Sequence, residues 1–468
     1  MRRKSTSPFA EFAMSRLPLA LALVACCGPL LAAEPVKHLV LVSVDGLAAS
    51  YLTEPRAEMP VLRKLAKEGA VAKGMKAAFP TVTWPTHTSL VTGVAPAKHG
   101  VLGNNVWDRK KERQVVYIGD PELTKDEAVR VPTIYDAAHQ AGLKCGSVIW
   151  PACTAAKSLD WIIPDAGKAE LHLKYTTPGL VDECKAAGIE ADKLGEWGWN
   201  KDKSTDRDVL YTKVAKFLLE KKGANLVLVH LITPDGVEHN YGPHTPEAYQ
   251  AVKDADTRIG EIYETLQKPP FAGKSTLIVV SDHGFAPYEK RIHPNVVLQQ
   301  MGLIEVEDGT KPTMRRAWTV AQGGSAFVYL LDDAAKKEWG PKVKEKLAAT
   351  EGIQKVLESA EFTKLGLPTA ETNPQAPDFV LLTGPGYSFQ DTLGATAITA
   401  AGGLKGTHGH EPSPDYMHAT FVAAGAGIKP GVDLGVIQNV DVAPTMAKLL
   451  GVQMPGVEGR VLVEALQP

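Results

Sequence analysis

The chain has 468 residues, of which 44% are hydrophobic, 22% charged and 7% aromatic, and its 51 basic and 53 acidic residues give a formal net charge of −2. This composition is that of a globular protein with a hydrophobic core, and it excludes disordered, collagen-like and disulfide-scaffold proteins. The near balance of charge provides no basic surface for duplex nucleic acid, so we expect no such partner.

Residues 1–33 are predicted to be an export signal peptide and not part of the fold. Three basic residues at positions 2–4 are followed by the apolar run Leu17–Val24, which is the order found in signal peptides. The run is too short to cross a bilayer, so no transmembrane span is expected. Two outcomes stay open: cleavage at the end of this segment, which gives a periplasmic or secreted protein, or a lipid anchor at the lipobox-like Cys26, which gives an outer-membrane lipoprotein.

Three cysteines follow the predicted signal peptide: Cys145, Cys153 and Cys184. An oxidising compartment permits one disulfide among them, and all three pairings stay open. The odd thiol argues against a disulfide framework. No histidine motif surrounds any of the three, so none is expected to be a nucleophile.

Buried strands and helices alternate along residues 34–468. Continuous β-branched and leucine-rich runs predict strands at His38–Val44, Asn225–Leu231 and Ser275–Val280. Helical patterns occur at Met59–Glu68, Val131–Ala141, Asp208–Lys221, Pro246–Leu266 and Asp441–Leu450. This alternation predicts an α/β fold with a doubly wound, mainly parallel sheet flanked by helices.

Two intervals interrupt this pattern. Residues 109–199 are rich in Pro, Gly and Lys and are predicted to be a loose insertion. Residues 294–402 are predicted to be an inserted cap lobe, with strands at Ser325–Leu331 and Asp378–Leu382 and a helix at Ala334–Ala348. The remainder is interpreted as one domain that these insertions divide.

Each of the three predicted strands leads to an aspartate followed by turn-forming residues: Asp45, Asp235 and Asp282. Ligand sites of open α/β sheets lie beyond the carboxyl ends of the strands. The three carboxylates are therefore expected at one edge of one sheet. A lone Asp-Gly is more often a turn residue than a ligand, so the prediction depends on the combination.

Histidines accompany these aspartates. His283 follows Asp282 directly, His239 lies four residues after Asp235, and His408 stands in a Gly-rich segment. The spacing of Asp235 and His239 puts both side chains on one face of a helix. Asp and His are ligands that suit zinc, and six of them without cysteine predict the two-metal centre of a hydrolase.

Thr83 is the candidate nucleophile. It precedes Pro85, which suits the first turn of a helix, so Thr83 is expected near a helix N-terminus, where an anion is favoured. A hydroxyl there can attack a phosphorus or sulfur centre. Plain capping of the helix is the alternative.

The motifs together resemble the alkaline phosphatase superfamily, and most of all its nucleotide pyrophosphatase/phosphodiesterase branch. The resemblance covers Lys37–Val101, Leu226–Pro243, Ile278–Phe285 and Gly406–Pro412 in order. It implies an alkaline phosphatase-like fold. The segment Phe79–His87 is similar to the family pattern Phe-Pro-Thr-x-Thr-aromatic-Pro-Asn-His, whose second threonine is the nucleophile, and this implies that role for Thr83.

The resemblance also implies two Zn²⁺ per chain. One would be held by Asp45, Asp282 and His283 and would activate Thr83. The other would be held by Asp235, His239 and His408.

Two residues beside Thr83 are expected to bind substrate. Trp84 stands where the family often has a phenylalanine that stacks on the base of the substrate, and core packing is its alternative. Thr86 stands where the family usually has an asparagine whose amide donates to a phosphate oxygen. Loss of such a donor can cost about 3 kcal/mol of transition-state stabilisation, so Thr86 bears on substrate preference.

The implied function is that of an exported two-zinc phosphodiesterase or nucleotide pyrophosphatase that acts on a small phosphate ester, such as a nucleotide, through a phosphothreonine. A phosphomonoesterase is the alternative, although no arginine lies in the metal or nucleophile motifs to bind a dianion. Phosphonate or sulfate ester hydrolysis also stays open. A non-catalytic metal-binding surface protein is the alternative from another class, and the retained nucleophile and ligands count against it.

Overall fold

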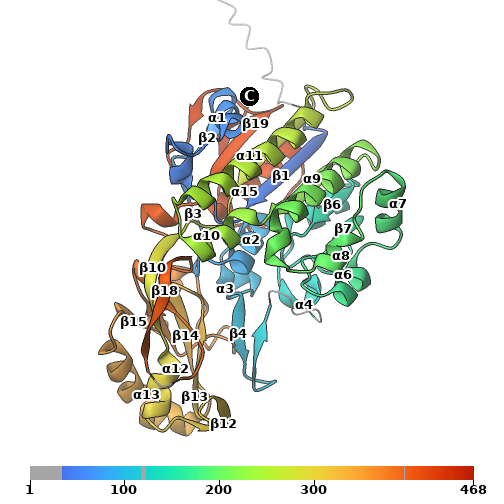
Figure 1. Ribbon diagram of the computed structural model, residues 1–468. Helices are drawn as coiled ribbons and strands as arrows, with labels where there is room; N and C mark the ends of the chain where they lie inside the picture. The colour runs from blue at the N-terminus through green and yellow to red at the C-terminus, as the bar shows by residue number, and fades with distance from the viewer. Residues whose placement is uncertain (1–33, 118–122, 395) are drawn as a thin grey trace, which may run out of the picture. The chain divides into compact units, whose positions relative to one another are not determined.

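An eight-stranded sheet forms the centre of the fold (Figure 1). The computed structural model describes residues 34–117, 123–394 and 396–468, so the predicted signal peptide and Cys26 lie outside the described residues. In spatial order the strands are β20 (Val432–Asp433), β2 (Ala70–Val71), β19 (Phe421–Gly425), β9 (Ser275–Val280), β1 (His38–Val44), β8 (Leu226–Leu231), β6 (Cys145–Val148) and β7 (Trp161–Ile163). β19 is antiparallel to both its neighbours and the other neighbouring pairs are parallel, which confirms the predicted mainly parallel sheet.

Helices cover both faces of this sheet because alternate residues of its strands are apolar on each side. Val40 and Val42 of β1 pack in a core with α1 (Pro60–Glu68), α9 (Ser204–Glu220) and α11 (Pro246–Leu266). Leu39 and Leu41 pack in a second core on the other face. The helices of that face are α2 (Thr83–Thr92), α5 (Ile134–Gln140) and α15 (Val442–Leu450). The doubly wound arrangement is therefore confirmed.

The three strands that were predicted to carry carboxylates lie side by side in the order β9–β1–β8 and run parallel. Ser43 of β1 is in register with His230 of β8 and with Val280 of β9. Their carboxyl ends consequently meet at one edge of the sheet. The loop after each strand delivers its side chains to that edge.

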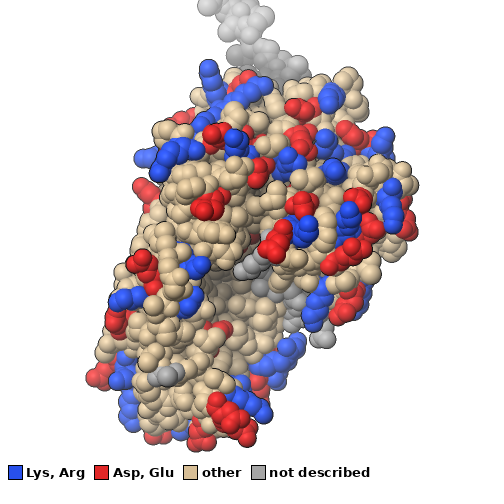
Figure 2. Space-filling model, viewed as in Figure 1, with Lys and Arg blue, Asp and Glu red and all other residues tan. Residues whose placement is uncertain are grey.

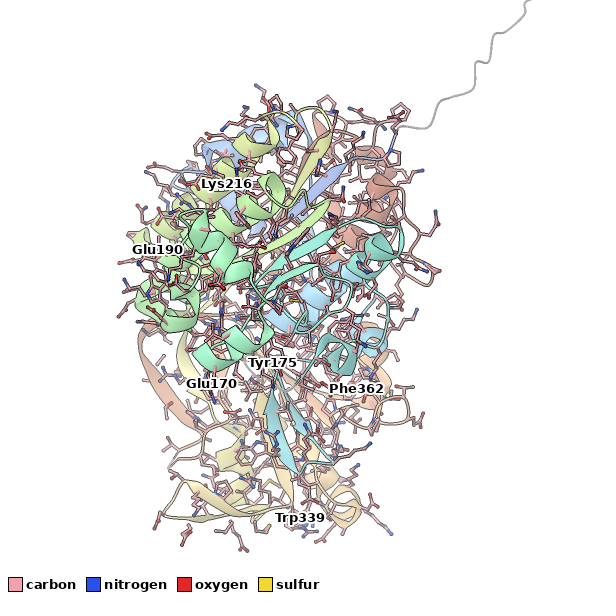
Figure 3. The ribbon with its side chains drawn as sticks, turned by 90° about the vertical axis from the view of Figure 1, so that its right-hand side faces the viewer. Glu170, Tyr175, Glu190, Lys216, Trp339 and Phe362 are labelled. Carbon is pink, nitrogen blue, oxygen red and sulfur yellow. The ribbon has the colours of Figure 1, made fainter. Side chains whose placement is uncertain are left out.

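The interval between β9 and β19 contains the elements predicted for the cap. It includes β11 (Ile304–Glu307), β12 (Lys311–Arg315), β13 (Ala317–Ala321), β14 (Ser325–Leu330), α12 (Pro294–Gln300), α13 (Asp333–Ala348), β15 (Lys355–Glu358), β16 (Phe379–Leu382) and β17 (Gly386–Phe389). The long strands β10 (Ala286–Ile292) and β18 (Ile398–Thr407) form an antiparallel pair. β10 leads from the edge of the main sheet into the cap, and β18 leads back beside it. In Figure 3, Trp339 on α13 lies at the opposite end of the drawn chain from Lys216 on α9.

Part of the interval predicted as a loose insertion contributes to the main sheet. β6 and β7, within residues 109–199, are the last two strands beyond β8. They have four and three residues and include Gly146 and Ser147, so they lack the long apolar run that identified the other strands. The helices α6 (Ala169–Tyr175), α7 (Leu180–Ala186) and α8 (Lys193–Trp197) follow them.

Cys145, Cys153 and Cys184 are all buried free thiols. None of the three pairings that the sequence left open is formed. The Cys153 sulfur lies 3.2 Å from the Ser147 hydroxyl. In the described part of the chain, no helix combines the length and the apolar character that crossing a membrane requires.

Candidate active site

The site edge of the sheet brings together the candidate ligands from four elements. Asp45 follows β1, Asp282 and His283 follow β9, and His408 follows β18. Asp235 and His239 lie on α10 (Thr233–Tyr241), which confirms the predicted helical spacing. α10 begins within two residues of the end of β8, so its first turn is fixed at the sheet edge.

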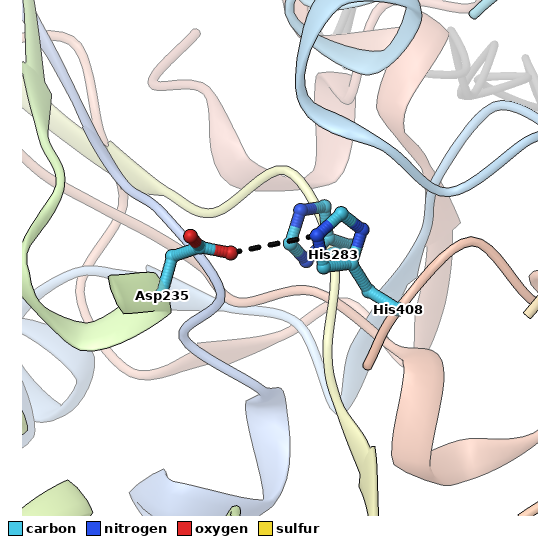
Figure 4. A group of neighbouring side chains, drawn as sticks. All are labelled: Asp235, His283 and His408. Carbon is cyan, nitrogen blue, oxygen red and sulfur yellow. Dashed lines mark ion pairs between the residues drawn. The ribbon is translucent and has the colours of Figure 1, made fainter. Parts of the chain in front are cut away.

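Three side-chain atoms form a small triangle on one side of the site. Asp235 Oδ1 lies 3.3 Å from His239 Nε2 and 3.5 Å from His408 Nε2, and the two nitrogens are 3.2 Å apart (Figure 4 shows Asp235 and His408). Three ligands of a tetrahedral zinc ion with bonds near 2.0 Å are about 3.3 Å from one another. The side chains therefore match the spacing that zinc requires.

Backbone carbonyls hold the Nδ1 proton of these two histidines. His239 Nδ1 donates to the Gly406 carbonyl at 3.0 Å, and His408 Nδ1 donates to the Thr81 carbonyl at 3.0 Å. A neutral imidazole with its proton on Nδ1 has a lone pair on Nε2. In these neutral forms the two Nε2 atoms and the Asp235 carboxylate converge, an arrangement that a cation between them would stabilise.

A second group shares the same edge. His283 Nε2 lies 3.4 Å from Asp45 Oδ1 and 3.2 Å from Asp282 Oδ2. His283 Nδ1 is 3.2 Å from the Gly284 carbonyl, so its Nε2 also presents a lone pair. The His283 ring stacks on that of His408 with centroids 3.8 Å apart, and the donor atoms of Asp235, His283 and His408 also lie within 4.8 Å of one another. The two groups are therefore adjacent and meet at His283.

Buried polar atoms at this edge lack hydrogen-bond partners. Among the described residues, these atoms include Asp45 Oδ1, Asp235 Oδ1, Asp282 Oδ2 and His283 Nε2. Burial, and then the neighbouring Asp235, raises the pKa of Asp45 well above its ordinary value, and burial and Asp45 do the same to the pKa of Asp282. Burial and His239 lower the pKa of His408 to about 4. These residues suit divalent cations, which would satisfy the unpaired atoms and favour the ionised carboxylates.

Thr83 is the first residue of α2, as the sequence predicted, and its side chain is buried. The Thr83 carbonyl accepts a hydrogen bond from His87 Nδ1 at 2.8 Å, and the same nitrogen lies 3.5 Å from Asp282 Oδ2. His87 therefore links the first turn of α2 to the group of Asp45, Asp282 and His283. Thr81, two residues before Thr83, binds the segment of His408 through its carbonyl and its hydroxyl.

Trp84 and Thr86 are less open to a substrate than the sequence suggested. The Trp84 side chain is only 2% exposed and stacks on Tyr117 with centroids 6.0 Å apart, a placement that matches the core-packing alternative. The Thr86 hydroxyl donates to the Val82 carbonyl at 2.6 Å. It is thus engaged with the backbone of its own helix.

Sequence reasoning missed two residues that contact this site. The Asn104 side-chain oxygen accepts the Trp84 backbone N–H at 2.8 Å, which leaves its NH₂ group beside the first turn of α2. His230 Nε2 lies 3.0 Å from Asp45 Oδ2. Asn104 stands in a loop without a motif, and His230 is hidden inside an apolar strand, so only the fold reveals their positions.

Known proteins match this chain along most of its length. A family model described as type I phosphodiesterase / nucleotide pyrophosphatase matches residues 39–411. The chain is 26% identical over 415 residues to ectonucleotide pyrophosphatase/phosphodiesterase family member 1 of Homo sapiens, which covers 88% of this chain and 40% of that protein. It is 24% identical over 449 residues to family member 7 of Rattus norvegicus, with 93% of this chain and 89% of that protein covered. The chain thus spans about 40% of the length of the family member 1 proteins.

The fold matches solved structures as well. One is murine ectonucleotide pyrophosphatase/phosphodiesterase 5, an inactive variant with alanine in place of a threonine, in complex with AMP. It gives a TM-score of 0.66 at 18% identity and covers 92% of this chain and 100% of that chain. The human protein of the same name also gives a TM-score of 0.66, at 20% identity.

Proposed function

The chain belongs to the type I phosphodiesterase / nucleotide pyrophosphatase family, and from that premise we propose that it is an exported hydrolase of phosphate diesters that uses two zinc ions and a phosphothreonine intermediate. The observation that carries the proposal is the convergence of metal-ligand atoms at the sheet edge. The Nε2 atoms of His239 and His408 lie beside each other and beside the Asp235 carboxylate, and His283 faces Asp45 and Asp282.

Each group has the residues to hold one ion. Asp45, Asp282, His283 and the Thr83 hydroxyl would hold the first, and Asp235, His239 and His408 the second. Zinc bound at these positions supplies Lewis-acid stabilisation of the charge that develops on phosphate oxygens and lowers the pKa of a bound hydroxyl group.

Thr83 is the nucleophile of this proposal. Its position at the first turn of α2 places backbone N–H groups and the positive end of the helix dipole beside the incoming phosphate. The Thr83 oxygen forms a bond to phosphorus while the opposite P–O bond breaks, and the hydroxyl proton is released as the departing alkoxide gains one. Water then cleaves the phosphothreonine and restores Thr83.

Asn104 replaces Thr86 as the candidate amide donor to a phosphate oxygen. Its oxygen is held by the Trp84 N–H, so its NH₂ group is oriented without loss of freedom on substrate binding. Thr86 and Trp84, which the sequence suggested as substrate contacts, would instead fix the first turn of α2 by their backbone bond and packing.

A diester fits this site better than a monoester. The residues of the metal and nucleophile motifs include neither arginine nor lysine, which a monoester dianion would require. A nucleotide is a candidate substrate because the solved structure of the murine protein is a complex with AMP. The proposed location is periplasmic or extracellular, with a lipid anchor at Cys26 as the alternative that the mass of the mature N-terminal peptide would reveal.

Purified protein should hydrolyse bis-p-nitrophenyl phosphate faster than p-nitrophenyl phosphate, and a chelator should abolish both activities. Metal analysis should find two zinc ions per chain. Thr83→Ala should remove turnover and retain metal, with Thr92→Ala at the other end of α2 as the matched control. Chelator-insensitive turnover, or activity that survives in Thr83→Ala, would contradict the proposal.

A further inference from the structure

A cavity of about 280 Å³ extends from the site to the cap strands. His239 and His408 form part of its wall, and so does Val82, the residue before Thr83. Tyr288 of β10 and the cap segments Ala321–Gly323 and Ser388–Asp391 form the rest of the wall described here. Figure 2 shows the molecule hollowed between β10 and β18 on one side and β4 (Asn105–Asp108) on the other, with mostly uncharged visible walls.

The cap side of this cavity is rigidly attached to the ligand segment. The Gly324 N–H donates to the His408 carbonyl at 2.6 Å, and the Phe389 N–H donates to the Gly323 carbonyl at 2.7 Å. Gln322 is 4% exposed, its oxygen accepts the Asn104 N–H at 3.1 Å, and its NH₂ group donates to the Asn105 carbonyl at 2.6 Å. A Cβ on Gly409 would lie 1.7 Å from the Gln322 carbonyl, so the close approach of these segments requires glycine. The cavity is therefore preformed.

The wall offers hydrogen bonds but no positive charge. Among the described residues that line it, none is lysine or arginine, and the charged one is Asp391, which accepts a bond from Gln114 at 2.9 Å. The Tyr288 hydroxyl and the Gln390 side-chain amide make no hydrogen bond to another described residue, and Asn105 Oδ1 is buried without a partner. Donors and acceptors of neutral groups are thus available to a ligand.

The cavity borders His239 and His408, two residues of the second ligand group. In-line displacement places the departing oxygen opposite the attacking Thr83 oxygen. Thr83 is connected through His87 to the group of Asp282, whereas the cavity is lined by the ligands of the other group, His239 and His408. Resting on the function proposed above, we propose that this cavity is a leaving-group subsite for an uncharged polyhydroxyl alcohol, such as glycerol or a sugar.

The uncharged wall selects among diesters. A pyrophosphate or sugar phosphate leaving group would enter a space that has no cationic side chain. The Asp391 carboxylate would repel its negative charge. An alcohol with several hydroxyls can instead pair with Tyr288, Gln390 and Asn105. An apolar alcohol of similar size would leave these polar groups unpaired.

Microscopic reversibility gives a direct test. A bound alcohol can attack the phosphothreonine in place of water: its oxygen bonds to phosphorus, the bond from phosphorus to the Thr83 oxygen breaks, and the hydroxyl proton of the alcohol is balanced by the proton that Thr83 regains. The p-nitrophenyl ester of thymidine 5′-monophosphate reports total turnover through nitrophenolate. Chromatography reports the ratio of the transfer product to thymidine 5′-monophosphate with glycerol or 1-propanol as acceptor at equal concentration.

Glycerol should give about tenfold more transfer than 1-propanol, since two additional hydrogen bonds are worth roughly that factor. Gln390→Leu should reduce the glycerol-to-propanol ratio at least about threefold, and Tyr288→Phe, which removes one hydroxyl, should also reduce it. Gln300→Leu, an exposed site on α12 of the same lobe, is the matched control. Equal transfer to the two acceptors, or a ratio that both cavity variants leave unchanged, would overturn the subsite. A lack of nitrophenolate release would instead overturn the proposed function.

Discussion

Asp45 divides its two carboxylate oxygens between His230 and the ligand group. Oδ2 lies 3.0 Å from His230 Nε2, and Oδ1 lies 3.4 Å from His283 Nε2. His230 comes from β8 and is in register with Ser43 of the neighbouring strand, two residues before Asp45. The hydrogen bond fixes the rotamer of Asp45 and orients its other oxygen toward the metal ligands.

Replacing His230 should weaken metal binding without removing any ligand. We expect His230→Phe to lower zinc affinity by about 10–100-fold, the range found when the hydrogen-bond partner of a ligand is lost. Competition with a chelator measures this affinity, and His139→Phe on α5, which is partly exposed, is the control. Unchanged zinc affinity in His230→Phe would show that the Asp45 orientation does not depend on this bond.

Asp282 should have opposite effects on stability with and without metal. Its side chain is fully buried, Oδ2 lacks a partner, and burial raises its pKa, so the ionised form is unfavourable without a cation. Asp282→Asn is therefore expected to raise the stability of the metal-free protein, by an amount on the order of 1 kcal/mol, and to lower that of the zinc-loaded protein. Thermal unfolding in chelator and in excess zinc measures both. Shifts of the same sign in both conditions would refute the metal assignment of Asp282.

His99 should make the stability depend on pH away from the site. It is fully buried, its Nε2 lies 3.0 Å from the Ser89 hydroxyl, and burial lowers its pKa to about 3. The unfolded chain binds a proton at His99 below about pH 6.5, whereas the folded chain does not until about pH 3. Stability is therefore lost as the pH falls below 6.5, by about 1.4 kcal/mol per pH unit from this residue.

Urea unfolding at pH 7.5 and at pH 5.5 tests this effect against His99→Gln. The variant should lose less stability than the wild type over the same interval, because glutamine does not titrate. Equal losses would mean that His99 takes up its proton in the folded state.

The three thiols should be unreactive in the folded protein. Burial raises the pKa of Cys145 and Cys153 to about 12 and that of Cys184 to about 11. The sulfur atoms are therefore inaccessible to a reagent and are not ionised to the reactive thiolate. A chromogenic disulfide reagent at pH 8 should label none of them promptly, and all three after unfolding in urea without reductant, in protein that lacks residues 1–33. One labelled thiol per unfolded chain would indicate a disulfide.

The parts of the fold that follow from local pattern could be predicted. The ranges of β1, β9 and α11 agree with the sequence-based ranges residue for residue. The apolar runs of the two strands stop just before Asp45 and Ser281, and the amphipathic pattern of α11 begins at Pro246. The short strands β6 and β7 could not, since their burial depends on docking beside β8.

The site shows the same division. Its ligand types were readable because the chemistry restricts them to Asp and His beside turns. The contacts that orient the site residues could not be predicted. Gln322 binds Asn104 across 218 positions and His230 binds Asp45 across 185, and no local pattern encodes such contacts. His283 lies with Asp45 and Asp282, the residues it was predicted to join, and its ring also lies close to Asp235 and His408.

The stereochemical outcome at phosphorus tests the central role of Thr83 most directly. A diester phosphorothioate of defined configuration would be hydrolysed in ¹⁸O-water and the configuration of the product determined. Attack by Thr83 followed by attack by water is two in-line displacements, so net retention of configuration is expected. Net inversion would show that water attacks the diester in one step and would contradict a phosphothreonine intermediate.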